Sequence, residues 1–173
     1  MKYLFLFLSA FTFAQQTKSV DFKTVNGHIS INPNSKSVNG DVTYTFEVLN
    51  PIDTIKIDAQ NMSFSGVELN HKKIPFATNG KELFLIYPFQ KGKNSIQFSY
   101  EARPKQTMYF VGSETTNNLQ IWTQGQGKYT SHWFPSFDDV NEKVIFNMEI
   151  AFDSKYKVVS NGVLKSKSED KNN

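Results

Sequence analysis

Apolar residues alternate with polar residues along several short runs of this 173-residue chain, and this period of two is the strongest constraint on its fold. The alternation runs over residues 42–48, 55–57, 96–100 and 144–152. A period of two is typical of strands with one buried and one solvent-facing side. Few windows show apolar residues at helical spacing, and six prolines interrupt most of those windows. The sequence therefore predicts an all-β domain.

Pairs of Asn-Gly or Lys-Gly punctuate these runs and supply the positive φ angles that tight hairpin turns need. They stand at residues 26–27, 39–40, 79–80, 91–92 and 161–162. Turns of this kind join antiparallel neighbours, so we predict an antiparallel β-sandwich. Residues 83–87 are apolar throughout, which is typical of a strand covered on both faces.

The first residues have the pattern of a secretory signal. Lys2 precedes the apolar run 3–8, and small residues lead to Ala14 before the polar Gln15. The run is shorter than the roughly 20 residues that a membrane span needs. We expect residues 1–14 to be a signal peptide, with the mature protein exported to the periplasm or the extracellular medium and lacking a membrane span. The chain has no Cys, so it needs no disulfide and carries no lipid at the cleavage site.

Residues 15–173 are expected to form one β-sandwich domain, since no shift in composition marks an internal boundary. Residues 165–173 are polar and have two interpretations. They are either a disordered terminus or part of a hairpin that ends before its second strand, because residues 156–164 already run strand, turn, strand. We favour the second interpretation, in which the sandwich is incomplete at its C-terminus.

The residue inventory excludes several kinds of chemistry. The net charge of +3 comes from lysines separated by acids, which does not favour nucleic acid as a partner. Three scattered His residues and no Cys leave no zinc motif and no cysteine nucleophile, so we expect no transition-metal site within the chain. Asp138 and Asp139 could hold calcium, but two adjacent acids more commonly cap a loop.

One stretch, residues 121–139, is unusually rich in Trp, Gln and Gly. Gln124 and Gln126 lie two positions apart, so on an extended segment their side chains point to the same side. Paired amides beside aromatic rings suggest a site for polar groups such as a peptide terminus or a sugar. Alternatively, the amides satisfy backbone groups at a corner of the sandwich.

Four segments in this part of the chain resemble the M1 family of zinc aminopeptidases in order and spacing. They are Thr123–Gln126, Trp133–Asp139, Lys143–Phe146 and Tyr156–Gly162. The family pattern is a Thr-Gln-x-Glu/Gln segment, a Phe-Pro-x-x-Asp-Glu-Pro block, a Lys-x-x-Phe strand and a Val-x-Ser-Asn-Gly turn. Val140 stands where this family usually has the Pro of that block. Ser136 stands where this family frequently has Cys.

The resemblance implies a saddle-like N-terminal β-sandwich that forms one wall of a substrate cleft. Zinc and the catalytic residues would lie in a downstream domain outside residues 1–173, where zinc activates water and a Glu acts as general base. By similarity, Gln126 binds the free α-amino group of a peptide substrate, and Gln124 is a second contact. The partners implied are the substrate's N-terminus and that catalytic domain. The chain alone should be inactive.

Two other functions fit the same residues. The chain could be a stand-alone exported binding module for carbohydrate or peptide, with Trp122, Tyr129 and Trp133 as stacking surfaces. It could also be a scaffold domain of a cell-envelope assembly.

Overall fold

The computed structural model describes residues 16–126 and 128–169, so the predicted signal peptide lies outside the described residues. Strands dominate this part of the chain, and its helices are two short 3-10 turns. None of its helices has the length and hydropathy needed to cross a bilayer. The elements are η1 (Gln16–Lys18), β1 (Val20–Asn32), β2 (Ser37–Val48), β3 (Ile52–Asp58), β4 (Ser63–Leu69), β5 (Lys72–Lys73), β6 (Phe76–Thr78), β7 (Glu82–Phe89), β8 (Gly92–Ala102), β9 (Met108–Val111), β10 (Gln120–Thr123), η2 (Thr130–His132) and β11 (Ile145–Ala151).

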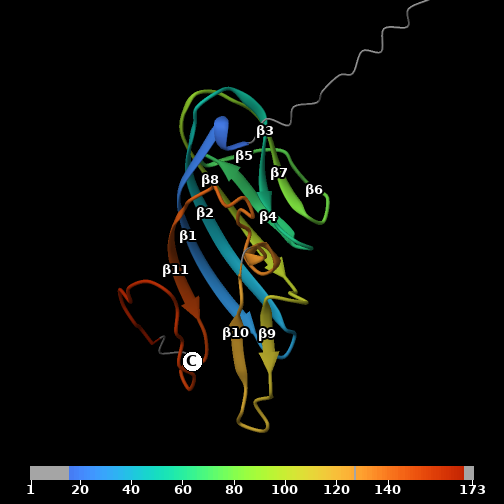
Figure 1. Ribbon diagram of the computed structural model, residues 1–173, viewed down its shortest axis with the longest axis vertical. Coiled ribbons are helices and arrows are strands. Elements are labelled where there is room, and N and C mark those ends of the chain that lie inside the picture. Colours follow the sequence, from blue (N-terminus) through green and yellow to red (C-terminus); the bar gives the residue numbers. More distant parts are fainter. Residues whose placement is uncertain (1–15, 127, 170–173) are drawn as a thin grey trace, which may run out of the picture.

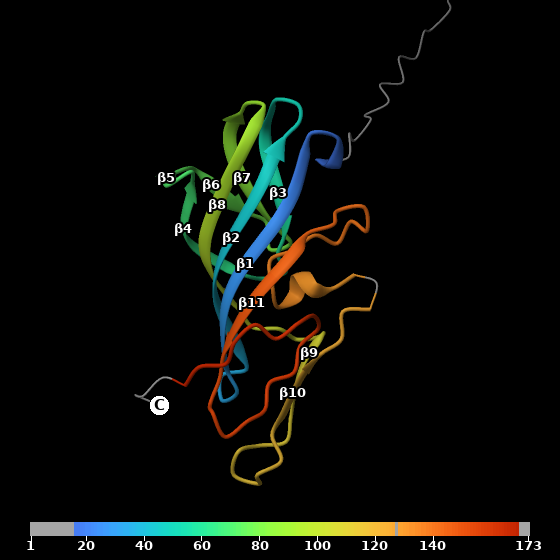
Figure 2. The ribbon, with the colours of Figure 1, turned by 90° about the vertical axis from the view of Figure 1, so that its left-hand side faces the viewer.

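Three sheets build the domain. A six-stranded sheet has the order β11-β1-β2-β8-β4-β5, a three-stranded sheet has the order β3-β7-β6, and β9 and β10 form a separate hairpin. The three-stranded sheet covers one end of the large sheet, whereas the β9–β10 hairpin extends at the other end (Figures 1 and 2). The prediction of an all-β fold with antiparallel sheets is confirmed.

The core lies between the two larger sheets. Alternate residues of β2 point inward, so that Tyr44 and Phe46 are buried. Phe46 meets Phe89 edge-on across the sandwich, with ring centroids 6.1 Å apart. Buried Ile55 and Leu85 line the three-stranded sheet on the other side. This alternation of β2 is the pattern that predicts a half-buried strand.

Two of the predicted turns are wrong. Asn26–Gly27 and Asn39–Gly40 lie inside β1 and β2, which pair without interruption across both positions. The glycines serve close packing instead. A Cβ at Gly27 would lie 2.9 Å from the Phe134 ring, and one at Gly40 would lie 2.5 Å from the Tyr100 ring. The pairs at 79–80 and 91–92 do turn the chain, with φ of 81° and 135° at their glycines.

The pairing of β11 also differs from the prediction, because β11 runs parallel to β1. Before β11, the chain leaves the β9–β10 hairpin, and residues 128–143 cross the inner side of the large sheet (Figure 2). It therefore enters β11 from the end at which β1 begins. A parallel neighbour requires a long crossover of this kind rather than a hairpin turn.

Two further expectations fail for lack of a covering layer. Residues 83–87 are covered on one face only, since Leu83 and Leu85 are fully buried whereas Ile86, which points to the other face, is 44% exposed. Residues 156–164 form no strand, so the predicted strand, turn and strand are not present there. Gly162 does have the positive φ, 91°, that the predicted turn needs. Val159 and Leu164 are each 81% exposed. No strand among the described residues pairs with that segment, so its apolar side chains have no sheet to pack into.

Candidate functional site

Gln124 and Gln126 follow directly after β10 and are both exposed. The Gln124 backbone amide donates a 2.8 Å hydrogen bond to the Thr107 carbonyl, which fixes the exit of the strand. Neither glutamine side chain has a hydrogen-bond partner among residues 16–126 and 128–169. Both side chains therefore face solvent in the part of the chain that the structure describes.

The loop that carries the glutamines is tied down at Tyr129. Its backbone has a φ of 127°, a conformation that L residues rarely adopt. Three contacts hold it there. The Thr107 hydroxyl donates to the Tyr129 carbonyl at 3.1 Å, the His132 amide donates to the same oxygen at 3.1 Å, and the Tyr129 amide donates to Asp138 Oδ1 at 3.3 Å. Strain held in this way is common at functional sites.

Asp138 and Asp139 act as loop caps. Asp138 Oδ2 accepts a 2.9 Å bond from the Ser131 hydroxyl, and the Asp138 amide donates to Asp58 Oδ2 at 2.7 Å. Burial raises the pKa of Asp58, and this hydrogen bond from Asp138 opposes the shift. Asp139 Oδ1 accepts from the Asn141 amide at 2.9 Å. Among the described residues, no three His, Cys, Asp or Glu side chains are grouped so that they could hold a metal ion.

Residues 133–138 are docked against the large sheet. Phe134 is fully buried. The Tyr44 hydroxyl donates to the Pro135 carbonyl at 2.6 Å, and the Tyr100 hydroxyl donates to the Trp133 carbonyl at 3.0 Å. Asp58 and Ser136 exchange backbone hydrogen bonds of 2.8 and 2.9 Å. The segment that follows the two glutamines in the chain is therefore attached to the core.

Two buried serines, Ser131 and Ser136, are expected to have opposite effects on stability when each is replaced by alanine. In the described part of the chain, Ser136 Oγ is the one buried side-chain polar atom without a hydrogen bond, whereas Ser131 Oγ bonds to Asp138. An unsatisfied buried hydroxyl costs free energy, so we expect Ser136→Ala to raise the free energy of unfolding by about 1 kcal/mol. Ser131→Ala should lower it by a similar amount. Urea unfolding measures both, and a loss of stability in Ser136→Ala would contradict this assignment.

Glu142 links the end of this segment to the first strand. Its Oε1 accepts a 3.2 Å bond from the Phe22 amide. Burial raises the pKa of Glu142 to about 7, although the Phe22 hydrogen bond opposes the shift. The folded state therefore favours the protonated carboxyl of Glu142. The contribution of this carboxyl to the free energy of unfolding is fully present below the unfolded pKa of 4.5 and is lost as the pH rises through about 7.

We expect the free energy of unfolding to fall by about 1 kcal/mol between pH 5 and pH 8 because of Glu142, a figure reduced for its partial exposure. Glu142→Gln should remove this part of the pH dependence. Glu169→Gln is the control, since its side chain is 70% exposed. Urea unfolding at both pH values checks the difference. An unchanged pH slope in Glu142→Gln would show that this carboxyl does not carry it.

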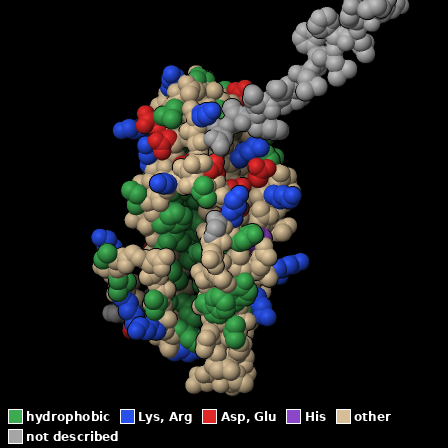
Figure 3. Space-filling view, in the orientation of Figure 1, with side chains coloured by type: hydrophobic (Ala, Val, Ile, Leu, Met, Phe, Trp, Pro, Cys, Tyr) green, Lys and Arg blue, Asp and Glu red, His purple; other side chains and the backbone are tan. Residues whose placement is uncertain are grey.

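The aromatic residues near the glutamines have separate neighbours. Trp122 stacks on Tyr109 with centroids 4.4 Å apart, while Trp133 packs on Phe134 at 5.7 Å. The Tyr129 ring lies nearest to His132, at 5.8 Å. The described residues therefore give no single stacking platform from the three rings. Figure 3 shows hydrophobic side chains gathered along the middle of this face and over the β9–β10 hairpin.

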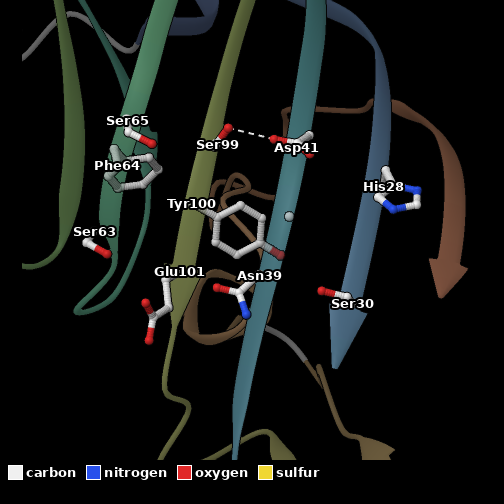
Figure 4. A pocket seen from close by; sticks show the side chains of 11 residues that line it. His28, Ser30, Asn39, Asp41, Ser63, Phe64, Ser65, Ser99, Tyr100 and Glu101 are labelled. Atoms are coloured by element: carbon white, nitrogen blue, oxygen red, sulfur yellow. Dashed lines mark hydrogen bonds between the residues drawn. The ribbon is translucent and has the colours of Figure 1, made fainter. Parts of the chain in front are cut away.

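A polar hollow of about 440 Å³ lies on the outer face of the large sheet, away from the glutamines. It is lined by side chains of β1, β2, β4 and β8 (Figure 4). Asp41 accepts a 2.6 Å hydrogen bond from the Ser99 hydroxyl there, and Glu101 accepts a 3.0 Å bond from Arg103. Both acids in the hollow therefore already have partners.

Comparison with known proteins identifies the family. The family model described as the Peptidase M1 N-terminal domain matches residues 23–173. The chain belongs to this family. A mutant M1 zinc metallopeptidase from Deinococcus radiodurans, solved with a Tyr-Ser-Ala substrate, is 14% identical with a TM-score of 0.71, covering 89% of this chain and 37% of that one. Yeast LTA4 hydrolase in complex with bestatin is 16% identical with a TM-score of 0.68, covering 82% and 25%.

A curated relative, Probable aminopeptidase 1 from Sulfurisphaera tokodaii, is 23% identical over 109 residues. The match takes in 63% of this M1 domain but only 14% of the relative. The chain thus spans a small part of the proteins that it matches. At these low sequence identities, the likeness to the solved structures shows a shared fold and nothing further.

Proposed function

We propose that residues 15–173 form the substrate-cleft domain of an exported zinc metallo-aminopeptidase, with residues 1–14 as its signal peptide. The proposal rests on membership of the M1 family and on one structural observation. Gln124 and Gln126 stand exposed, without side-chain hydrogen-bond partners among the described residues, between β10 and the segment 133–138 that packs on the core.

Gln126 is proposed to accept a hydrogen bond from the α-ammonium group of a peptide substrate through its side-chain oxygen. Gln124 would make a second contact near the first substrate residue. A neutral amide binds an ammonium group more weakly than a carboxylate does, because hydrogen bonds between charged partners are about twice as strong. The domain would bind and orient the substrate's N-terminus rather than carry out the chemistry.

The described residues do not suit a zinc ion, since no group of three candidate ligands is present among them. We propose that zinc is held by a downstream catalytic domain of a longer protein. The contribution of this chain is then confined to one wall of the cleft.

The test compares the full-length protein with residues 15–173 alone. We expect one zinc per full-length chain after dialysis, together with hydrolysis of an aminoacyl anilide. Residues 15–173 alone should bind no stoichiometric zinc and cleave no anilide. A full-length protein that lacks both zinc and anilide hydrolysis would overturn the proposal and favour a binding module for carbohydrate or peptide.

A further inference from the structure

Four lysines line one cavity at the end of the domain opposite the β9–β10 hairpin. The cavity has a volume of about 430 Å³, and its lysines are Lys72, Lys73, Lys91 and Lys93. Lys72 and Lys73 come from β5, Lys91 from the β7–β8 connection and Lys93 from the start of β8, all in the upper part of Figure 2. The two pairs are separated in the sequence, and folding brings them together.

The β4–β5 hairpin and the connection from β7 to β8 build this site. Asn70 and His71 connect β4 to β5 with φ of 49° and 64°. Asn70 is bound to β8 on both sides, because its Oδ1 accepts from the Ser95 amide at 2.8 Å and its Nδ2 donates to Asn94 Oδ1 at 2.9 Å. These bonds hold β5 beside the turn at Lys91. The cavity is therefore defined by side chains that are fixed by the backbone around them.

The lysines of the site are not joined to acids by ion pairs among the described residues. No Asp or Glu lines the cavity, and none of its four lysines forms an ion pair within the described ranges. The nearest acids by strand register are Glu68, opposite Lys73, and Glu47, opposite Lys93. Glu68 instead accepts a 3.0 Å hydrogen bond from Gln97. Elsewhere in the domain, lysines do find acids, as in the pair of Lys56 and Glu82 at 3.5 Å.

We propose that this cavity binds a saccharide carrying several sulfate or phosphate groups. Lysine ammonium groups are suited to such oxyanions. The side-chain oxygen of Gln90, which accepts no hydrogen bond from the described residues, can accept one from a sugar hydroxyl. Tyr87, which lines the cavity and is 42% exposed, offers a ring face for the apolar side of a sugar. The volume exceeds that of a single phosphate ion. This inference does not depend on the proposed peptidase function.

The probe is sucrose octasulfate, titrated into the full-length protein by calorimetry at low and at physiological salt. Sucrose and inorganic phosphate are the comparison ligands. We expect octasulfate to bind, with a Kd that rises with salt, and sucrose not to bind. The variant Lys72→Gln/Lys73→Gln/Lys91→Gln/Lys93→Gln should bind about tenfold more weakly or worse. Tyr87→Ala should weaken binding about fivefold with no change of charge.

The matched control is Lys36→Gln/Lys81→Gln/Lys105→Gln/Lys165→Gln, which removes the same charge from exposed lysines outside the cavity. It should change the Kd by less than about twofold. Equal losses in both variants would show unspecific attraction and overturn the site, as would no binding by the wild type. Phosphate binding as tightly as octasulfate would overturn the saccharide. If the fourfold variant does not fold, Lys91→Gln/Lys93→Gln must still weaken binding.

Discussion

Phe134→Ala is expected to lower the free energy of unfolding by about 4 kcal/mol. The ring is fully buried and meets Tyr100 edge-on at 6.0 Å. It also packs so close to β1 that Gly27 has no room for a Cβ. Neighbours held in two packed strands cannot collapse into the space left by the ring, so the loss of buried area and the cavity both add to the cost.

Urea unfolding of the chain measures this effect, with Val140→Ala as the control. Val140 lies in the same segment but is 70% exposed, so its truncation should change the free energy of unfolding by less than about 0.5 kcal/mol. A loss below about 1.5 kcal/mol for Phe134→Ala would mean that residues 133–138 are not anchored through this ring.

Gly40→Ala is expected to lower the free energy of unfolding by about 3 kcal/mol. The added methyl group would lie 2.5 Å from the Tyr100 ring and 3.1 Å from the His28 carbonyl. Tyr100 cannot move aside without losing its hydrogen bond to the Trp133 carbonyl, and the His28 carbonyl belongs to the paired strand β1. Both neighbours are therefore fixed.

The control for Gly40 is Gly66→Ala. Gly66 has open space around it and a φ of 62°, so only the backbone penalty of about 1 kcal/mol applies. A second test combines Gly40→Ala with Tyr100→Leu. The double variant should lose less free energy of unfolding than the sum of the losses in the two single variants. Equal costs at positions 40 and 66, measured by urea unfolding, would show that packing against Tyr100 does not select glycine.

Local patterns predict the strands of this domain well but not the strand pairings. The alternation in β2 is visible in the sequence because neighbouring residues alone determine which face each side chain takes. The role of Gly40 depends on Tyr100 in another strand, so the pair Asn39–Gly40 has the sequence signature of a turn. The parallel pairing of β11 likewise depends on the path of residues 128–143 across the sheet, which no short window contains.

The same limit applies to the candidate site. The motif around Gln124 and Gln126 is read directly from the sequence. Asp58 is 80 residues from Asp138, to which it is hydrogen-bonded, and Glu142 is 120 residues from Phe22. No pattern in the sequence marks either contact. No sequence pattern predicts the cavity with four lysines either, since its charges come from β5 and from the region where β7 leads into β8.

The most direct test is the KM for an aminoacyl anilide, measured with the full-length protein and corrected for the folded fraction. We predict that Gln126→Glu lowers KM about fivefold, or about 1 kcal/mol, because a charged acceptor replaces a neutral one. Gln126→Ala should raise KM, and Gln124→Ala should raise it less. Equal KM values across the wild type and the three variants, with changes confined to thermal stability, would show that Gln126 does not bind the substrate's amino group.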